Sequence, residues 1–275
     1  MRVAILGSSP YSETGCAAAA RLAQLGMVPV GALTLPSWDR RTLLRKVGQW
    51  GWRESLRYAR AKLTPGAGVE TNRIRNPYLE KSLRQGDSVW RNLHAVGEHY
   101  GFPVVTCSDQ NSAHAISEIK RWSPDILVFT GGNILREEVL RVPRVGILNA
   151  HLALLPEFRG MSSPEWSLLC DVPLGITIHF MDSGVDTGPI VLRREFTATE
   201  GVESLTDLRN RMIAEGIELL AEAIAGLDCG TLAPMPQRDR EKDSQYFVMH
   251  ESLKAAATRK LKKGRLNPVA DRCDG

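Results

Sequence analysis

The stretch that decides the fold runs Val145-Gly146-Ile147-Leu148-Asn149-Ala150-His151. Its apolar first part, Val145 to Leu148, predicts a buried strand, and two polar side chains then follow two residues apart. Side chains at positions i and i+2 of a strand point to the same side. Asn149 and His151 are therefore expected to project together from the end of a sheet into one cleft.

Apolar runs alternate with helical segments on both sides of this stretch. Near the start, residues 2–6 predict a strand, residues 14–25 an Ala-rich helix and residues 27–33 a second strand. This βαβ beginning implies a parallel sheet with right-handed crossovers. The other segments expected are strands at 103–106, 125–130, 145–149, 176–181 and 190–196, and helices at 113–120, 164–170 and 203–225. The fold class predicted is α/β, with a mostly parallel twisted, Rossmann-like sheet flanked by helices.

A domain over residues 1–226 is expected, with a helical insertion at about 37–99 and a short C-terminal extension at 227–275. The insertion should hold one or two helices before Pro65 and another at about 79–99. Its arginines and tryptophans suggest either a solvated helix face with buried tryptophans or an RNA-binding surface; the first interpretation is preferred. The basic stretch Lys254 to Arg265 suggests a helix end or a disordered tail.

The composition is ordinary for a globular protein, with 43% hydrophobic and 24% charged residues among 275. The first residues read as a strand, not a signal peptide, and no apolar run is long enough to span a bilayer. Five scattered cysteines and no zinc-like spacing predict a reduced, cytoplasmic protein without metal. The net charge of +4 suits an anionic ligand, but makes nucleic acid an unlikely partner.

A second polar group follows the later strand Gly175-Ile176-Thr177-Ile178-His179, in a loop that contains Asp182 and Asp186. Together, Asn, His and Asp side chains can stabilise an oxyanion, move a proton and orient an imidazole. The plainer alternative is that Asn149 caps a turn and His151 is a surface histidine. Either aspartate could instead cap its own loop.

These residues resemble the formyltransferase family, which includes glycinamide ribonucleotide, methionyl-tRNA and sugar-amine formyltransferases. The shared motifs are Asn149-Ala-His151, Leu155-Pro-Glu-Phe-Arg159-Gly160, Thr177-Ile-His179 and Asp186-Thr-Gly188. The likeness is clear over about residues 125 to 195 and fainter in the N-terminal half. It implies that a formyl group moves from 10-formyltetrahydrofolate to an amine by direct attack, with no metal.

The resemblance also implies roles for single residues. Asn149 and His151 would polarise the formyl oxygen, and Asp186 would pair with His151 and handle the proton. Asp186 is preferred over Asp182 because Thr-Gly-Pro-Ile follows it, as in the family.

The folate would be bound by the loop Gly131, Gly132, Asn133, Ile134 and Leu135, and by Asp182 and Gly184. Residues expected to contact the acceptor are Ser8, Ser9, Arg159, Ser162 and His179. Alternatives are open for most of them. The Gly-Gly pair and Ser8-Ser9 could be plain strand-to-helix turns, Arg159 could order its loop, and His179 could be structural. Ser163 is the expected N-cap of a helix with Pro164 in its first turn.

The acceptor is expected to be a small-molecule amine, either an amino sugar or an amine of a specialised metabolite. Initiator tRNA is disfavoured because residues 228–275 contain few strand-like runs. Hydrolysis of 10-formyltetrahydrofolate and a methionyl-tRNA formyltransferase-like activity are the alternatives, and a homodimer is left open.

Overall fold

A seven-stranded sheet forms the centre of the protein in a computed structural model, which describes residues 1–37, 74–86, 88–237 and 245–262. Its strands lie in the order β10-β9-β7-β6-β1-β2-β5. They are β1 (Val3–Gly7), β2 (Gly31–Thr34), β5 (Val104–Thr106), β6 (Ile126–Phe129), β7 (Gly146–His151), β9 (Gly175–Phe180) and β10 (Ile190–Glu195). All neighbours pair in parallel except β9, which is antiparallel to both β7 and β10. The predicted mostly parallel α/β sheet is confirmed.

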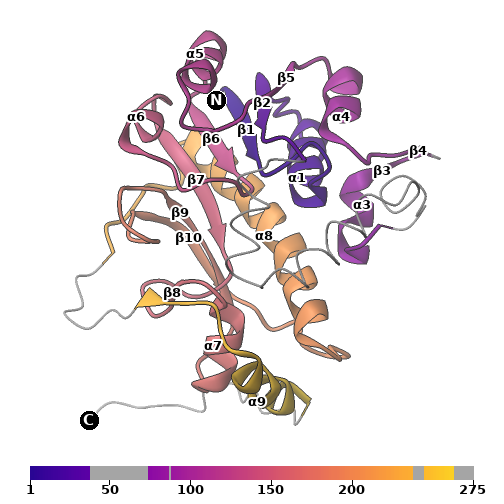
Figure 1. Ribbon diagram of the computed structural model, residues 1–275, viewed down its shortest axis with the longest axis vertical. Coiled ribbons are helices and arrows are strands. Elements are labelled where there is room, and N and C mark those ends of the chain that lie inside the picture. Colours follow the sequence, from indigo (N-terminus) through magenta and orange to yellow (C-terminus); the bar gives the residue numbers. More distant parts are fainter. Residues whose placement is uncertain (38–73, 87, 238–244, 263–275) are drawn as a thin grey trace, which may run out of the picture.

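Helices cover both faces of this sheet (Figure 1). One face carries α1 (Glu13–Gln24), α4 (Leu93–Tyr100) and the long α8 (Leu205–Asp228), and the other carries α5 (Ala113–Trp122) and α6 (Glu137–Leu140). The remaining elements are η1 (Pro77–Leu79), α3 (Glu80–Leu83), β3 (Arg84–Gln85), β4 (Ser88–Val89), β8 (Arg159–Gly160), α7 (Ser163–Leu169), β11 (Gln245–Tyr246) and α9 (Glu251–Lys262). Helices α7 and α9 pack together at one end of the molecule, beside β8 and β11 (Figure 1).

Alternation along the strands explains the two cores. In β1, Val3 and Ile5 face α1 and α8, whereas Ala4 and Leu6 face α5 and α6. All four are buried, because a strand covered on both faces has no side that meets water. This is why the sequence shows continuous apolar runs at these strands instead of an alternating pattern.

The predicted helix at about 79–99 is wrong. The chain instead forms η1 and α3, a short β3–β4 hairpin and then α4. Four apolar residues of this segment are buried: Leu79, Leu83, Leu93 and Val96. Their spacing resembles that of one helix although a hairpin interrupts the backbone. Gly86 has a φ of 57° in the hairpin, which a helix interior does not allow. The predicted helices before Pro65, with Trp38, Trp50 and Trp52, lie outside the described residues.

The described part of the C-terminal extension contains regular secondary structure. Its strand β11 pairs in parallel with β8, and α9 buries Ala257 and Leu261. Of the two interpretations of the basic stretch, the described part is helical up to Lys262. Within the described parts of the chain, no helix combines the length and apolar character required to cross a membrane.

The order of the strands places a switch point between β1 and β6. From β1 the chain proceeds through β2 to β5 in one direction, and β6 then pairs with the other side of β1. The loops after β1 and β6 therefore separate at the carboxyl edge of the sheet, which is where open α/β sheets bind ligands. Ser8, Ser9 and the loop 131–135 all lie at this edge.

Candidate active site at the carboxyl edge of the sheet

Asn149 and His179 meet because their strands pair antiparallel. The register of β7 and β9 sets Asn149 opposite His179 and His151 opposite Thr177. Side chains directly opposite each other on one face of a sheet interact, and Asn149 Nδ2 lies 3.2 Å from His179 Nε2. His179 Nδ1 lies 2.9 Å from the carbonyl oxygen of Phe180, which can only accept, so Nδ1 carries the proton. Nε2 of His179 then accepts from the Asn149 amide and fixes its orientation.

His151 is almost wholly buried beside this pair, and both of its nitrogens face acceptors. Nε2 donates to the Phe158 carbonyl at 2.7 Å, which fixes the tautomer. Nδ1 lies 3.4 Å from Asp186 Oδ2. The expected pairing of these two side chains is therefore present in the geometry, but in this structure Nε2 meets a backbone carbonyl.

Asp186 approaches the cluster from the loop between β9 and β10. Its Oδ1 lies 3.5 Å from His179 Nε2, and its Oδ2 accepts a hydrogen bond of 2.8 Å from the backbone N–H of Gly160. One carboxylate thus contacts both histidines and the loop after β7. The structure brings Asn149, His151, His179 and Asp186 into one partly buried cluster.

Burial and charge act in opposite directions on the two titratable partners. Burial lowers the pKa of His151 below its ordinary value, and the nearby Asp186 carboxylate offsets this only in part. Burial alone would raise the pKa of Asp186, but its contacts with the two imidazoles and the hydrogen bond from Gly160 outweigh it. The pKa of Asp186 therefore lies below its usual range, and the carboxyl group is ionised at neutral pH.

The loop after β6 is held by a side chain that sequence reasoning missed. Gln110 is fully buried, and its Nε2 donates to the carbonyls of Gly7 and Gly131 while its Oε1 accepts from Asn133 N. Gly132 has a φ of 145°, and a Cβ there would lie 2.1 Å from Gln110 Oε1. The next residue, Asn111, binds the carbonyl of Ile134. Some backbone groups expected to contact the folate are thus engaged within the protein.

Ile134 lies in the same loop and is 92% exposed. The loop thus presents one exposed apolar side chain beside the switch point. Ser8 lies directly beside Gly131, since a Cβ on Gly131 would be 3.2 Å from Ser8 Cβ. Ser9 belongs to the turn before α1, where its carbonyl accepts from Ser12 N.

The other predicted contact residues are engaged locally. Asp182 Oδ1 accepts from Gly184 N at 3.1 Å and from Thr187 Oγ1 at 2.6 Å, which is the loop-capping arrangement considered as its alternative. Arg159 donates to Gln237 Oε1. Ser162 Oγ accepts from Met249 N, and it contacts the segment after β11.

The predicted helix start at Ser163 is off by one residue. Helix α7 begins at Ser163 with Ser162 in the N-cap position, at a φ of 56° and without a side-chain cap. Ser163 Oγ instead donates to the carbonyl of Gly160. This ties the first turn of α7 to the loop that contacts Asp186.

Gln237 is the second residue that sequence reasoning missed. Its side chain bonds the carbonyls of Asp186 and Gly188 and also Arg159. No motif surrounds it, so the sequence contains no signal for this role. Gln110 had a weak signal, because Asp109-Gln110-Asn111 is a polar run just after a strand, at the edge where ligands bind.

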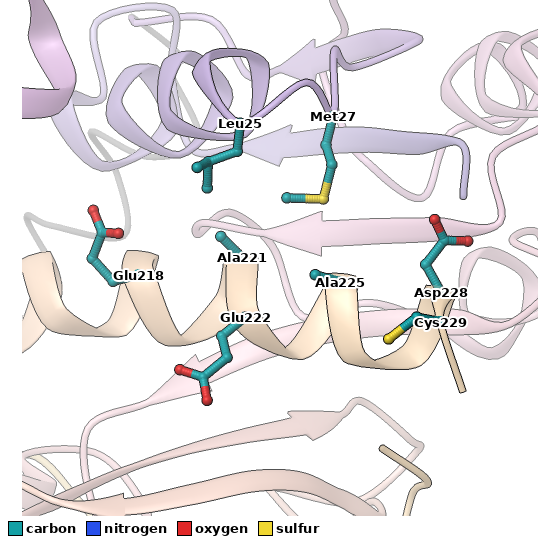
Figure 2. Close-up of a pocket in the computed structure, with 8 residues that line it drawn as sticks. All are labelled: Leu25, Met27, Glu218, Ala221, Glu222, Ala225, Asp228 and Cys229. Carbon is teal, nitrogen blue, oxygen red and sulfur yellow. The ribbon is translucent and has the colours of Figure 1, made fainter. Parts of the chain in front are cut away.

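A groove of about 640 Å³ lies at the opposite edge of the sheet (Figure 2). Leu25 and Met27 face Ala221 and Ala225 of α8 across it, close to the amino-terminal end of β1. None of the predicted site residues line this groove. The cluster of Asn149, His151, His179 and Asp186 is therefore separate from this groove.

The fold and the cluster define a class of protein: an α/β protein with an Asn-His-Asp group suited to acyl transfer at the carboxyl edge of its sheet. A comparison with protein families agrees, because the formyl transferase family model matches residues 72–224. The chain belongs to this family, as the sequence motifs predicted.

Relatives and solved structures agree with this assignment. A methionyl-tRNA formyltransferase of Pelobacter propionicus is 34% identical over 142 residues, which are 51% of this chain and 44% of that protein. The chain spans about half the length of the curated relatives it matches. Glycinamide ribonucleotide transformylase 1 of Symbiobacterium toebii has the same fold, with a TM-score of 0.54 at 19% identity over 86% of this chain and 94% of that chain.

An N-formyltransferase of Helicobacter canadensis, solved with folinic acid and dTDP-3-aminofucose, has a TM-score of 0.57 at 14% identity. The match covers 95% of this chain and 80% of that chain. At these identities the two structures establish the fold.

Proposed function

We propose that this protein is an N-formyltransferase that moves a formyl group from 10-formyltetrahydrofolate to the amine of a small-molecule acceptor. The observation that carries the proposal is the cluster of Asn149, His151 and Asp186 at the carboxyl edge of the sheet, in a chain of the formyl transferase family. The folate supplies the formyl group when it is bound.

Asn149 is the residue that meets the formyl oxygen. Its amide has two N–H groups, and His179 Nε2 accepts only one of them. The other can donate to the oxygen as negative charge develops during attack. One such donor, already oriented, is worth about 3 to 4 kcal/mol of barrier.

His151 and Asp186 handle the proton. The attacking amine must lose a proton as its bond to the formyl carbon forms and the bond from that carbon to the folate nitrogen breaks. Nδ1 of His151 faces the Asp186 carboxylate, so a proton on Nδ1 is stabilised by an ionised partner at 3.4 Å. The same proton then goes to the departing folate nitrogen. While protonated, the imidazole places positive charge beside the formyl oxygen, which is the polarising role inferred for it from the sequence.

The loop 131–135 is the proposed folate contact, and the turn at Ser8 and Ser9 the proposed acceptor contact. Gln110 keeps the first loop rigid, and Ile134 offers an exposed apolar surface. His179 is better assigned as a support for Asn149 than as a substrate contact, because it is buried and both of its nitrogens have partners.

The test is an acceptor panel with 10-formyltetrahydrofolate. The purified protein is mixed with amino-sugar nucleotides and small amines, and tetrahydrofolate and formylated products are measured by absorbance and mass spectrometry. Transfer to at least one small amine, lost in Asn149→Ala, is expected. Release of formate at a rate independent of every amine would identify a hydrolase instead. No turnover of the folate under any condition would refute the proposal.

Methionyl-tRNA is the second candidate acceptor. It is favoured by the 34% identity to a methionyl-tRNA formyltransferase. The same assay with charged initiator tRNA separates the two acceptors, since a tRNA-directed enzyme should formylate methionyl-tRNA far faster than any free amine.

A further inference from the structure

The backbone at Asp186 is strained. Its φ of 53° lies in the left-handed region, which residues other than glycine rarely adopt. Such a conformation costs on the order of 1–3 kcal/mol and persists only where the surroundings enforce it. At the end of the same loop, a Cβ on Gly188 would lie 1.9 Å from the carbonyl oxygen of Phe180, so the loop is closely packed there.

Gln237 holds both ends of this strained turn. Its Nε2 donates to the carbonyl oxygen of Asp186 at 2.8 Å and to that of Gly188 at 2.7 Å. A primary amide has two N–H groups, so both are used here. Its Oε1 accepts from Nη2 of Arg159 at 2.9 Å. Carbonyls only accept and a guanidinium only donates, so these partners allow one orientation of the amide.

Strand β8 connects Gln237 to the side chain of Asp186. Arg159 is followed by Gly160, whose N–H donates to the Asp186 carboxylate. Gln237 thus fixes the backbone of Asp186 directly. It also contacts Arg159, the neighbour of Gly160, and Gly160 fixes the side chain of Asp186. Met235 and Ile190 exchange backbone hydrogen bonds of 2.8 Å, and this bridge places Gln237 alongside the loop.

We infer that Gln237 is a positioning residue that holds the carboxylate of Asp186 against His151 and His179 for catalysis. The inference rests on the proposed function and adds to it a residue outside the family match of 72–224. Without the two N–H donors, the carbonyls at 186 and 188 lose their partners and the turn can relax out of the left-handed region. The carboxylate then withdraws from the two imidazoles, which lie only 3.4 and 3.5 Å away.

Two variants test this role. Gln237→Met keeps the length of the side chain but removes every polar contact, and Gln237→Glu keeps an acceptor for Arg159 but cannot donate to the carbonyls. Both should lower kcat by at least ~10-fold while KM for the folate and for the acceptor changes by less than ~3-fold. If Gln237→Glu retained full activity, the contact with Arg159 would be the important one and the inference would fail.

Gln24→Met is the matched control. Gln24 Nε2 also donates to a backbone carbonyl, that of Ser82 at 3.3 Å, but on α1. It should leave kcat unchanged. If the Gln237 variants lowered thermal stability but left kcat unchanged, as Gln24→Met should, the role of Gln237 would be structural only and the inference would be wrong.

A second readout does not depend on activity. The imidazole of His151 can be titrated by NMR in the wild type and in Gln237→Met. The carboxylate of Asp186 raises the pKa of His151 against the effect of burial, so withdrawal of the carboxylate should move the titration to lower pH. An unchanged titration overturns the inference even if the wild type transfers formyl groups. A shift supports it even if no acceptor is found.

Discussion

At the scale of the residue, the pair His151 and Asp186 carries the proposed proton transfer. His151→Ala removes the base, and Asp186→Asn keeps the shape of the side chain but removes its charge. Each should reduce kcat by at least ~100-fold, since each group acts on the proton only as the reaction proceeds. Steady-state kinetics on the best acceptor of the panel measures this loss, and circular dichroism checks the fold.

Exposed Asp182 provides the comparison for these variants. Its carboxylate accepts from its own loop, so Asp182→Asn should retain most of the activity. Rates near those of the wild type in His151→Ala or Asp186→Asn would contradict the assignment of the pair.

Gly132 is the residue on which the loop after β6 depends. Gly132→Ala would force a Cβ to within 2.1 Å of buried Gln110, at a φ that side chains avoid. We expect a loss of about 2 to 4 kcal/mol in the free energy of unfolding, measured by urea denaturation, together with weaker folate binding.

Gly26→Ala separates strain from overlap. Gly26 also has a positive φ, of 82°, but nothing lies within 4 Å of an added Cβ. Its substitution should cost only about 1 kcal/mol. Equal losses for the two variants would mean that contact with Gln110 does not matter.

The sequence predicted the central members of the site but not their supports. The two-residue period of a strand places Asn149 and His151 on one side whatever the rest of the fold does, so their convergence could be derived. Gln110 and Gln237 act through backbone carbonyls of distant loops. Contacts of this kind depend on tertiary structure and leave no periodicity or spacing in the sequence.

At the scale of the element, the strands were predicted well because both faces of the sheet are covered. The helices were predicted where a cap coincides with the apolar pattern, as at Ser112 before α5. The apolar pattern gave the wrong prediction at 79–99. Here the short helices α3 and α4 pack residues into the same core although a hairpin separates them. In α9 only Ala257 and Leu261 are buried, so basic side chains obscured the helix.

An ion pair between a half-exposed arginine and a buried glutamate joins α7 to α8. Arg209 donates two hydrogen bonds to Glu165, whose side chain is only 4% exposed. Arg209→Ala would leave this carboxylate buried without its partner. We expect a loss of about 1.5 to 3 kcal/mol in the free energy of unfolding, measured by chemical denaturation, because water reaches the half-exposed arginine side of the pair.

Two comparisons bound this prediction. The exposed pair Arg84–Glu80, with both side chains 49% exposed, should contribute less than about 1 kcal/mol when Arg84 is replaced by alanine. The double variant Arg209→Leu, Glu165→Leu should recover much of the stability, because two apolar side chains leave no buried charge. A small loss in Arg209→Ala would show that Glu165 finds another partner.

At the scale of the whole molecule, the buried site makes stability depend on pH. His151 has a lowered pKa in the folded protein, so the unfolded chain binds its proton at a higher pH than the folded chain does. As the pH falls below about 6.5, the usual histidine value, unfolding takes up a proton and stability falls. Asp186 acts in the same direction at lower pH, because its stabilising charge is lost as the pH falls through its depressed pKa.

Thermal unfolding from pH 7.5 to 5.5 should therefore show a Tm that decreases as the solution becomes acidic. His151→Gln should flatten this decrease, since the neutral side chain takes up no proton on unfolding. His114→Gln, which removes an exposed imidazole from α5, controls for the loss of any histidine. A slope in His151→Gln as steep as in the wild type would contradict the lowered pKa of His151, and a steeper slope would mean that His151 is already protonated in the folded state at neutral pH. Its role would then be that of a permanent imidazolium beside the formyl oxygen, and the proton would have to be accepted by Asp186 alone.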